Sequence, residues 1–352
     1  MQFEYGCFHM VMNTIKFSLA REMYSEMPVT KMLWNGVKEK SFGLVFGPAK
    51  SGKTIFCENL AISIAIGRDS YFDYQLDGIP KKVLFIGLEE TFQSRISRNS
   101  LQFETLSEGE KLLMDENYEV QELEFPRFII NNENWTTLFD SIKNSGAEVV
   151  FIDSITRMNH GKLEDGKTAE EIMSKLRNIS QDLDVTLFAI HHTPKLHGNP
   201  ITMDSIKGSS VFAQESDFAV GISRTERKHR YMKNIFFRYA NDDDEFVKEF
   251  EINQNAWLNN SGEVDEDQIL QRSDRRRALD KRDTILEFFD SNPDVTYSYK
   301  DAVDLLKPKI GLQDRQIKTY LSKLSNLGII DGSKKGIYRS TNFQIQEGAS
   351  NE

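Results

Sequence analysis

Cysteine and long apolar runs are both scarce in this chain of 352 residues. The two cysteines, Cys7 and Cys57, lie far apart without metal-ligand spacing, which argues against a disulfide framework and favours a reducing cytoplasm. No apolar run approaches the roughly 20 residues that a membrane-spanning helix needs. The first residues also lack the basic start, uniform apolar stretch and small-residue cleavage site of a signal peptide. We therefore expect a cytoplasmic protein with no membrane partner.

Positive charge is in deficit as well. The formal net charge of −10 argues against a protein coated in positive charge. DNA binding remains open, because local fields matter more than the total charge, and a basic cluster lies at residues 272–282. The length suggests two domains, or one large domain with an appendage. Residues 1–30 read as an amphipathic arm or helix, which either covers its own domain or packs on a neighbouring subunit.

Short apolar runs alternate with helical stretches over residues 31–258. The runs expected as strands are SFGLVFG, KVLFIGLEE, RFIINN, AEVVFIDSI, VTLFAIHH and DFAVGIS. Helices are expected at Thr54–Ile66, Trp135–Lys143 and Ala169–Gln181. Continuous Val, Ile and Phe runs are typical of strands buried on both faces. The alternation predicts an α/β domain with a mostly parallel sheet flanked by helices.

The segment GPAKSGKT, residues 47–54, fits the phosphate-loop pattern G-x-x-x-x-G-K-[ST]. An apolar strand precedes it and a helix follows, which makes a chance match much less plausible. Glycines let the backbone N–H groups turn towards phosphate oxygens, and the helix N-terminus adds partial positive charge. Lys53 is expected to reach the β- and γ-phosphates of ATP. The residues expected to bind ATP are Gly47, Pro48, Ala49, Lys50, Ser51, Gly52, Lys53, Thr54 and Ile55.

A magnesium site is expected beside this loop. The run VVFIDSI places Asp153 at the C-terminal end of an apolar strand. We expect the Thr54 hydroxyl to ligate Mg²⁺ and Asp153 to hold the ion, usually through water. The expected cofactors are therefore ATP and Mg²⁺.

Polar pairs follow two further strands. Glu89 and Glu90 come after KVLFIGL, and one carboxylate, with Glu89 favoured, would orient the attacking water. The alternative is a solvated pair that caps the next helix together with Thr91. His191 and His192 end another strand, and His192 is expected to sense the γ-phosphate, with a metal ligand or a structural role as alternatives. Adjacent residues of an extended chain point opposite ways, so joint chelation by both histidines is disfavoured.

Taken in order, these motifs resemble the RecA-like ATPases, in particular the branch of the plasmid replication helicase RepA, with DnaB-type helicases and KaiC as cousins. The resemblance spans roughly residues 28–258 and rests on the phosphate-loop entry LWNGVKEKSFGLVFGPAKSGKT, on LEET, on IHHTPK and on IKGSSVFAQESDFAVGIS. It implies a homo-oligomeric ring, usually a hexamer, that holds ATP between neighbours. It also implies an arginine finger, matched by Arg238 in NIFFRYAND. The alternative is a surface or ion-paired arginine. Related helicases often carry Lys where this chain has Phe236, which leaves Lys233 or Arg230 as substitutes.

Two long loops would face the channel of such a ring. TRMNHGKLEDGKT follows the strand that ends in Asp153, and KLHGNPITMDSIKG follows the histidine pair. Long glycine-bearing loops often bind ligands, and cations in them would contact the backbone of single-stranded DNA. Neither loop carries an aromatic residue for base stacking. The residues expected to contact this DNA are Arg157, Lys162, Lys195 and Lys207.

A second domain is expected after a polar linker at residues 259–280. Helical stretches at Lys281–Ser291, Tyr299–Leu306 and Asp314–Leu327 precede GIIDGSKKGIYRS, which reads as a hairpin. This order resembles a winged-helix domain over residues 281–343, followed by a loose tail at 344–352. The expected partner is duplex DNA, and a protein-docking domain is the alternative. The expected DNA contacts are Arg315, Lys318 and Lys323 on the third helix and Lys334 and Lys335 on the wing.

The favoured function is a ring-forming, DNA-dependent ATPase, a replicative-type helicase of a plasmid, phage or mobile element. The alternative is a regulatory DNA-binding protein in which ATP switches oligomerisation without unwinding. A recombinase that coats DNA as a filament is less favoured, because no clear N-terminal polymerisation motif is seen.

Overall fold

The computed structural model describes residues 14–27, 29–158, 166–206, 209–225, 228–240, 246–271, 281–326, 328–332 and 336–341. The chain divides into two units. The first comprises Met1–His197, Ile201–Arg224 and His229–Glu263, and the second comprises Gly198–Pro200, Thr225–Lys228 and Val264–Glu352. Among the described residues, no helix has both the length and the apolar character that crossing a membrane requires.

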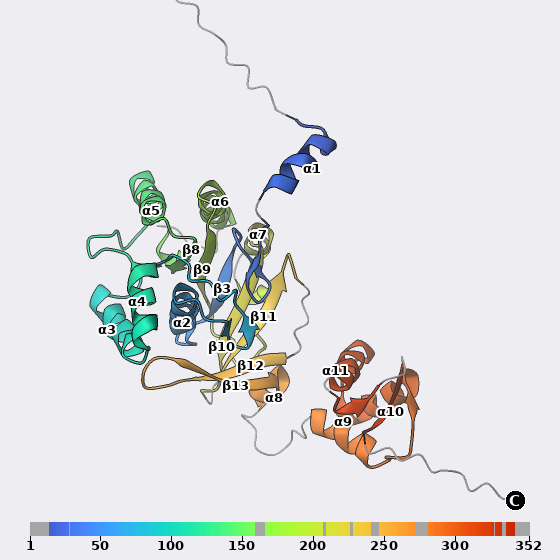
Figure 1. Ribbon diagram of the computed structural model, residues 1–352. Coiled ribbons are helices and arrows are strands. Elements are labelled where there is room, and N and C mark those ends of the chain that lie inside the picture. Colours follow the sequence, from blue (N-terminus) through green and yellow to red (C-terminus); the bar gives the residue numbers. More distant parts are fainter. Residues whose placement is uncertain are drawn as a thin grey trace, which may run out of the picture. The chain divides into compact units, whose positions relative to one another are not determined.

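A nine-stranded sheet forms the centre of the first unit (Figure 1). The strand order is β13-β12-β11-β10-β3-β9-β8-β6-β7. Strands β10 to β7 run parallel, whereas β11 is antiparallel to both β10 and β12. This mostly parallel sheet confirms the predicted α/β fold. The bounds are β3 (Phe42–Pro48), β6 (Val83–Gly87), β7 (Tyr118–Val120), β8 (Val149–Asp153), β9 (Thr186–Thr193), β10 (Phe218–Arg224), β11 (Arg230–Phe237), β12 (Phe246–Ile252) and β13 (Leu258–Asp265).

Helices cover both faces of this sheet (Figure 1). On one face, Phe56 of α2 is buried in a cluster with Val45, Phe85 and Phe151 of three parallel strands. Helix α6 contacts β3 and β9, and none of its buried residues belongs to that cluster. Apolar strands are therefore shielded on both sides, as their continuous Val, Ile and Phe runs predict. The helices are α1 (Phe17–Glu26), α2 (Lys53–Ala65), α3 (Phe92–Phe103), α4 (Glu108–Asn117), α5 (Asn132–Ser145), α6 (Gly166–Asp182) and α7 (Ser209–Glu215).

Local signals set the ends of these elements. The three helices expected in this unit are confirmed, with ends shifted by no more than three residues. Helix α5 starts early because the Asn131 side chain accepts a hydrogen bond from the Asn134 N–H, and it ends at Gly146, whose φ of 63° is left-handed. In α1, none of the residues is buried. Two short hairpins complete the unit, β1 (Met32–Trp34) with β2 (Val37–Lys38) and β4 (Ser70–Tyr71) with β5 (Tyr74–Gln75).

Two expectations about regular structure are wrong. The segment RFIINN forms no strand, because it is exposed around the single buried residue Ile129, whose N–H donates to the Arg157 carbonyl. The sheet edge beside β6 is instead taken by β7, which has the polar sequence YEV. Residues 259–271 of the expected linker form most of β13 and all of α8 (Glu266–Gln271). β13 and β7 are the two edge strands of the sheet. An edge strand has a neighbouring strand on one side only and is less enclosed than a central strand, so polar residues such as those of β13 are tolerated there.

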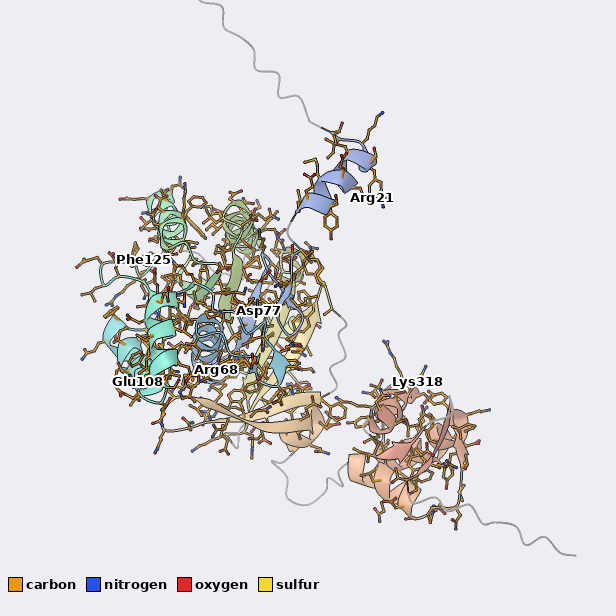
Figure 2. All side chains as sticks on the ribbon, viewed as in Figure 1. Arg21, Arg68, Asp77, Glu108, Phe125 and Lys318 are labelled. Atoms are coloured by element: carbon orange, nitrogen blue, oxygen red, sulfur yellow. The ribbon has the colours of Figure 1, made fainter. Side chains whose placement is uncertain are left out.

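The second unit contains α8 to α11 and a small antiparallel sheet of order β14-β16-β15. On α11, Ile317, Tyr320, Leu321 and Leu324 are buried at helical spacing, and Lys318 is exposed (Figure 2). The order α9, α10, α11, β15 and β16 matches the three helices and hairpin that the sequence predicts, and the short strand β14 lies between α9 and α10. The remaining bounds are α9 (Lys281–Asp290), β14 (Tyr297–Ser298), α10 (Tyr299–Ile310), α11 (Asp314–Asn326), β15 (Ile330–Asp331) and β16 (Ile337–Ser340).

Candidate functional site

The predicted phosphate loop joins β3 to α2. Gly47 has a φ of 154°, and a Cβ atom added there would lie 1.9 Å from the backbone carbonyl oxygen of Ile222 on β10. Gly52 caps α2 with a left-handed φ of 107°. Only glycine meets both demands, since side chains disfavour this backbone region and would collide with the neighbouring strand. The motif glycines therefore shape the loop and set its distance from β10.

Lys53 occupies the mouth of this loop. Its Nζ donates hydrogen bonds to the carbonyl oxygens of Gly47, at 2.9 Å, and Pro48, at 2.8 Å. Burial lowers the pKa of Lys53 to about 8, although the charges of Asp153 and Glu89 oppose the shift. An ammonium that is satisfied only by neutral carbonyls is poised for an anion, because charge-assisted hydrogen bonds to phosphate oxygens are stronger.

Asp153 faces the loop from the end of β8. Its Oδ2 accepts a hydrogen bond of 2.6 Å from the Thr54 hydroxyl, whereas its buried Oδ1 has no hydrogen-bond partner. Burial raises the pKa of Asp153 despite the hydrogen bond from Thr54. A buried carboxylate oxygen with a free lone pair, next to a hydroxyl, fits the oxygen ligands that Mg²⁺ prefers. The structure thus brings the two residues expected to hold the metal within hydrogen-bonding distance of each other.

Glu89 lies at the same sheet edge, just beyond β6. Its Oε1 accepts hydrogen bonds of 2.5 Å from the hydroxyls of Ser154 and Thr156, and its Oε2 lies 2.9 Å from His192 Nε2. Burial acts to raise the pKa of Glu89, but the hydrogen bonds from His192, Ser154 and Thr156 outweigh it and lower the pKa to about 2. Ligand atoms of Glu89, Asp153 and His192 all lie within 4.8 Å of one another. The carboxylate is therefore ionised and points into the site.

The two histidines of β9 point to opposite faces of the sheet. His192 contacts Glu89 on the side of the phosphate loop. The His191 ring is buried and stacks on Phe212 of α7, with centroids 4.8 Å apart. Burial, together with the charges of His192 and Lys53, lowers the pKa of His191 to about 4, so this ring is neutral at pH 7. Only His192 is placed where a nucleotide phosphate would arrive.

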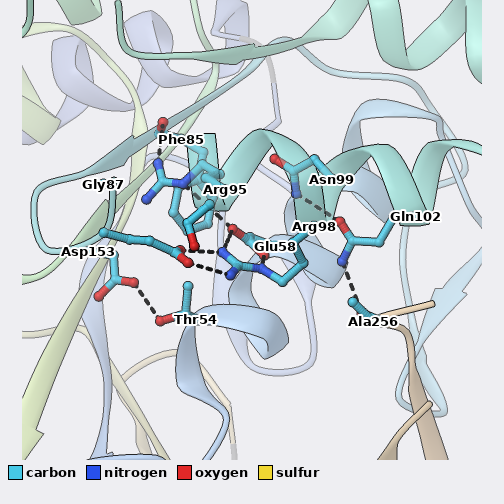
Figure 3. A network of polar contacts seen from close by, with 12 residues as sticks. Thr54, Glu58, Phe85, Gly87, Arg95, Arg98, Asn99, Gln102, Asp153 and Ala256 are labelled. Atoms are coloured by element: carbon cyan, nitrogen blue, oxygen red, sulfur yellow. Dashed lines mark hydrogen bonds and ion pairs between the residues drawn. The ribbon is translucent and has the colours of Figure 1, made fainter. Parts of the chain in front are cut away.

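Glu90 is held away from this cluster. Its carboxylate pairs with Arg98 at 2.6 and 2.8 Å, and Arg98 also grips Glu58 of α2 with two hydrogen bonds of 2.6 Å (Figure 3). Arg95 stands beside this group, 3.7 Å from Glu58 and above the ring of Phe85. Burial acts to raise the pKa of Glu90, but hydrogen bonding to Arg98 lowers it. The adjacent glutamates are thus separated: Glu89 faces the loop, and Glu90 pairs with Arg98, which ties α3 to α2 through Glu58.

Arg238, the expected finger, lies directly after β11. Its Nη1 is 3.3 Å from Asp217 Oδ1, and its Nη2 donates to two nearby backbone carbonyls. Asp217 precedes Phe218, which pairs with Gly43 near the start of β3, so Arg238 lies at the end of β3 opposite the phosphate loop. Within its own subunit the residue is ion-paired. A role as a finger towards a neighbour stays a prediction.

The residues expected to bind DNA are only partly described. Arg157 follows β8 in a short turn, with its guanidinium over the Phe128 ring at 4.9 Å, and Lys195 is exposed after β9. On α11, Arg315 and Lys318 are exposed and Lys323 is half-buried. The expected contacts with DNA therefore remain predictions. Lys162, Lys207, Lys334 and Lys335 lie outside the described residues.

Several residues of the site are not identified by the sequence motifs. Ser154 and Thr156 both hydrogen-bond to Glu89, and Arg98 fixes the alternative glutamate. Ser154 could have been identified from the sequence, because it directly follows Asp153 at the end of the strand. Nothing in the local pattern indicates Arg98, because its partner Glu58 lies on another helix.

Comparison with protein families agrees with this geometry. The AAA domain family (AAA_25) matches residues 13–198, which is more than half of the chain. The matched stretch includes the phosphate loop, Glu89, Asp153 and His192. A search of curated proteins found no significant match.

Proposed function

The chain belongs to the AAA domain family and is a P-loop ATPase of the RecA-like kind, and from this premise we propose that it is an ATP-hydrolysing motor that acts on DNA. We propose a ring-forming, replicative-type helicase of a plasmid, phage or mobile element, working in the cytoplasm as a homo-oligomer. The observation that carries the proposal is the convergence of Lys53, Thr54, Asp153, Glu89 and His192 at one edge of the sheet.

The side chains divide the chemistry among themselves. The loop amides and Lys53 would bind the phosphates, and Thr54 and Asp153 would hold Mg²⁺, which would supply positive charge against the triphosphate. Glu89 orients the attacking water. A carboxylate with a pKa of about 2 accepts a proton poorly at neutral pH. Glu89 must therefore give up some of its three hydrogen bonds before it can act on that water.

His192 is the group that can release Glu89. Its Nε2 contacts the carboxylate, and a γ-phosphate entering beside Lys53 would offer the ring a competing acceptor. Transfer of the His192 hydrogen bond from Glu89 to the phosphate would raise the basicity of the carboxylate only when ATP is bound. His192→Ala should then move the acid limb of kcat/KM to higher pH, because the free enzyme loses one hydrogen bond that lowers the pKa of Glu89. The Kd for ATP should change by less than about fivefold, since ATP binding exchanges one hydrogen bond of the ring for another and the difference is at most about 1 kcal/mol.

The ATPase part of the proposal has a direct test. Single-stranded DNA should stimulate ATP hydrolysis, and Lys53→Ala should abolish hydrolysis with and without DNA. Lys143→Ala removes an exposed lysine from α5 and serves as the matched control. Absence of strand displacement on forked substrates under every nucleotide condition would remove the helicase assignment and leave the ATPase.

Duplex binding by the second unit is tested separately. The exposed cations of α11, which include Arg315 and Lys318, support a winged-helix recognition helix. Lys318→Ala should reduce the slope of log affinity against log salt by about 0.9, the value for one lost phosphate contact. Lys300→Ala on α10 removes an exposed lysine of the same unit as a control. Unchanged slopes for both variants would point to a protein-docking domain.

An alternative function is an ATP-switched DNA-binding regulator without unwinding activity. Two observations favour it. Arg238 pairs with Asp217 in its own chain, and Phe236 stands where related helicases often carry lysine. Sequence-specific duplex binding that is unaffected by Glu89→Gln, together with slow turnover, would select this alternative.

A further inference from the structure

Two arginines stand beside the phosphate loop and have no part in the site described so far. Arg224 ends β10, Arg230 begins β11, and the two are direct cross-strand partners. Successive side chains of a strand point to opposite faces. Ile222 and Met232, two residues away on each strand, belong to the buried cluster on the α2 face. Both arginines therefore project from the face that carries the loop.

Arg230 reaches the loop itself. A Cβ atom added to Gly52 would lie 3.5 Å from Arg230 Cδ, which places the arginine stem against the residue that caps α2. Arg224 lies two residues beyond Ile222, whose carbonyl oxygen abuts Gly47 at the other end of the loop. The pair thus flanks the loop along its β10 side.

Neither arginine has its charge balanced within the described part of the chain. The Nε atoms of both are buried without a hydrogen-bond partner. No salt bridge joins either guanidinium to a described carboxylate, although other arginines of the same unit, such as Arg177 of α6 and Arg238 after β11, share Asp217. Burial and the charge of Arg224 lower the pKa of Arg230. Like charges directly opposite on neighbouring strands destabilise a sheet, so an anion is the missing component.

We propose that Arg224 and Arg230 form a second phosphate clamp, which binds the triphosphate of the nucleotide held by the loop of the same subunit. The proposal rests on ATP binding by the loop, a part of the proposed function, and is independent of DNA or unwinding. Guanidinium groups suit this task because their N–H fork matches phosphate oxygens. In this proposal Arg230 binds the nucleotide of its own subunit. The sequence instead suggests Arg230 as a replacement for the lysine that related helicases carry at position 236, a residue that would act on a neighbouring subunit.

The test uses variants that keep the packing of the stem. Arg230→Met and Arg224→Met retain an apolar side chain against the loop but remove the charge. Each should weaken binding of Mg²⁺–ATP, measured by titration calorimetry, by roughly ten- to a hundredfold, the range for one hydrogen bond to a charged group. The affinity for inorganic tripolyphosphate, measured by its competition with a fluorescent ATP analogue, should fall by the same factor. Arg230→Lys should retain part of the affinity.

A matched control and a second readout separate binding from structure. Arg68→Met removes an arginine near the far end of α2 (Figure 2) and should leave both affinities unchanged. Without nucleotide, Arg224→Met should raise the midpoint of thermal unfolding, because a like-charge repulsion disappears. Saturating Mg²⁺–ATP should raise the midpoint of thermal unfolding of Arg224→Met by less than it raises the midpoint of the wild type. A purely structural arginine would instead lower the midpoint without nucleotide.

The binding results separate a failure of the proposed function from a failure of the phosphate clamp. Wild-type protein that binds no ATP would remove the proposed function itself. Wild-type binding with unchanged affinities in both variants would overturn the clamp alone. Loss of ATP affinity with unchanged tripolyphosphate affinity would overturn it in favour of a contact to the base or ribose. Unchanged binding with slower hydrolysis only in the oligomer would assign the arginines to a neighbouring subunit.

Discussion

Replacing Arg98 by methionine should destabilise the first unit strongly. Glu58 is fully buried on α2 and receives two hydrogen bonds of 2.6 Å from Arg98. Methionine fills part of the space but leaves the Glu58 carboxylate with Arg95, at 3.7 Å, as its remaining cation. Removing one partner of a buried ion pair costs about 3–5 kcal/mol. The remaining cation favours the lower end, so we expect a loss of about 3 kcal/mol in the free energy of unfolding.

The loss should depend on pH in a defined direction. Burial raises the pKa of Glu58 even with Arg98 opposing it, and removal of Arg98 raises it further. A carboxyl whose pKa is higher in the folded state destabilises the protein as pH rises, because the unfolded chain then ionises more readily. The deficit of the variant should therefore be largest at pH 7 and above. It should shrink as the pH falls towards about 5, still above the unfolded pKa of about 4.3.

The tryptophans make the assay specific to this unit. All three, Trp34, Trp135 and Trp257, lie in the first unit, so their fluorescence during urea unfolding reports on it alone. A double-mutant cycle with Glu58→Gln should show that the double variant recovers part of the loss. Lys40→Met breaks an exposed pair with Asp184 and should cost less than about 1 kcal/mol. A cost for Arg98→Met no larger than this control at pH 7 would refute the reasoning.

Three further predictions address the site. Burial lowers the pKa of Lys53 to about 8, and bound phosphate should raise it. The affinity for Mg²⁺–ATP should therefore fall about tenfold between pH 7 and 9, and binding at pH 8 should take up about half a proton. Calorimetry in two buffers with different ionisation enthalpies measures the proton uptake, and Lys53→Arg should show neither effect. Gly47→Ala should weaken ATP binding by about a hundredfold, because the new methyl group meets a backbone carbonyl of β10. Gly109→Ala on α4, where nothing lies within 4 Å of the added Cβ atom, should be neutral when titrated with the same fluorescent analogue. Thr156→Val removes one hydrogen bond that lowers the pKa of Glu89, so the acid limb of kcat should move to higher pH; an unmoved limb would exclude Glu89 as its source.

The parts of the fold that depend on local pattern were predictable from the sequence. Continuous apolar runs predicted the central strands, and the loop motif predicted the turn before α2, because in both cases the signal lies within a few consecutive residues. Asp153 could be placed near Thr54 for the same reason, since parallel strands end at a common sheet edge. Edge strands escaped this logic. β7 and β13 are polar, and pairing with a neighbour rather than an apolar run makes them strands.

Contacts between distant elements limited the prediction of the site. The choice between Glu89 and Glu90 is made by Arg98 of α3, which binds both Glu90 and Glu58 of α2. No spacing rule links these three residues, because the fold alone brings them together. The position of Arg230 was equally hidden, since it lies far along the chain from Gly52 and meets it only through the antiparallel end of the sheet.

The end of β9 joins the two sides of the first unit through consecutive residues. His192 touches the carboxylate beside the nucleotide, and the ring before it, His191, is wedged against Phe212 on the opposite face. The two rings belong to consecutive residues of β9, so they share the backbone between them. Helix α7 starts at Ser209, at the end of a loop expected to meet DNA. Two consecutive side chains thus connect the nucleotide side of the sheet with the face that packs against α7.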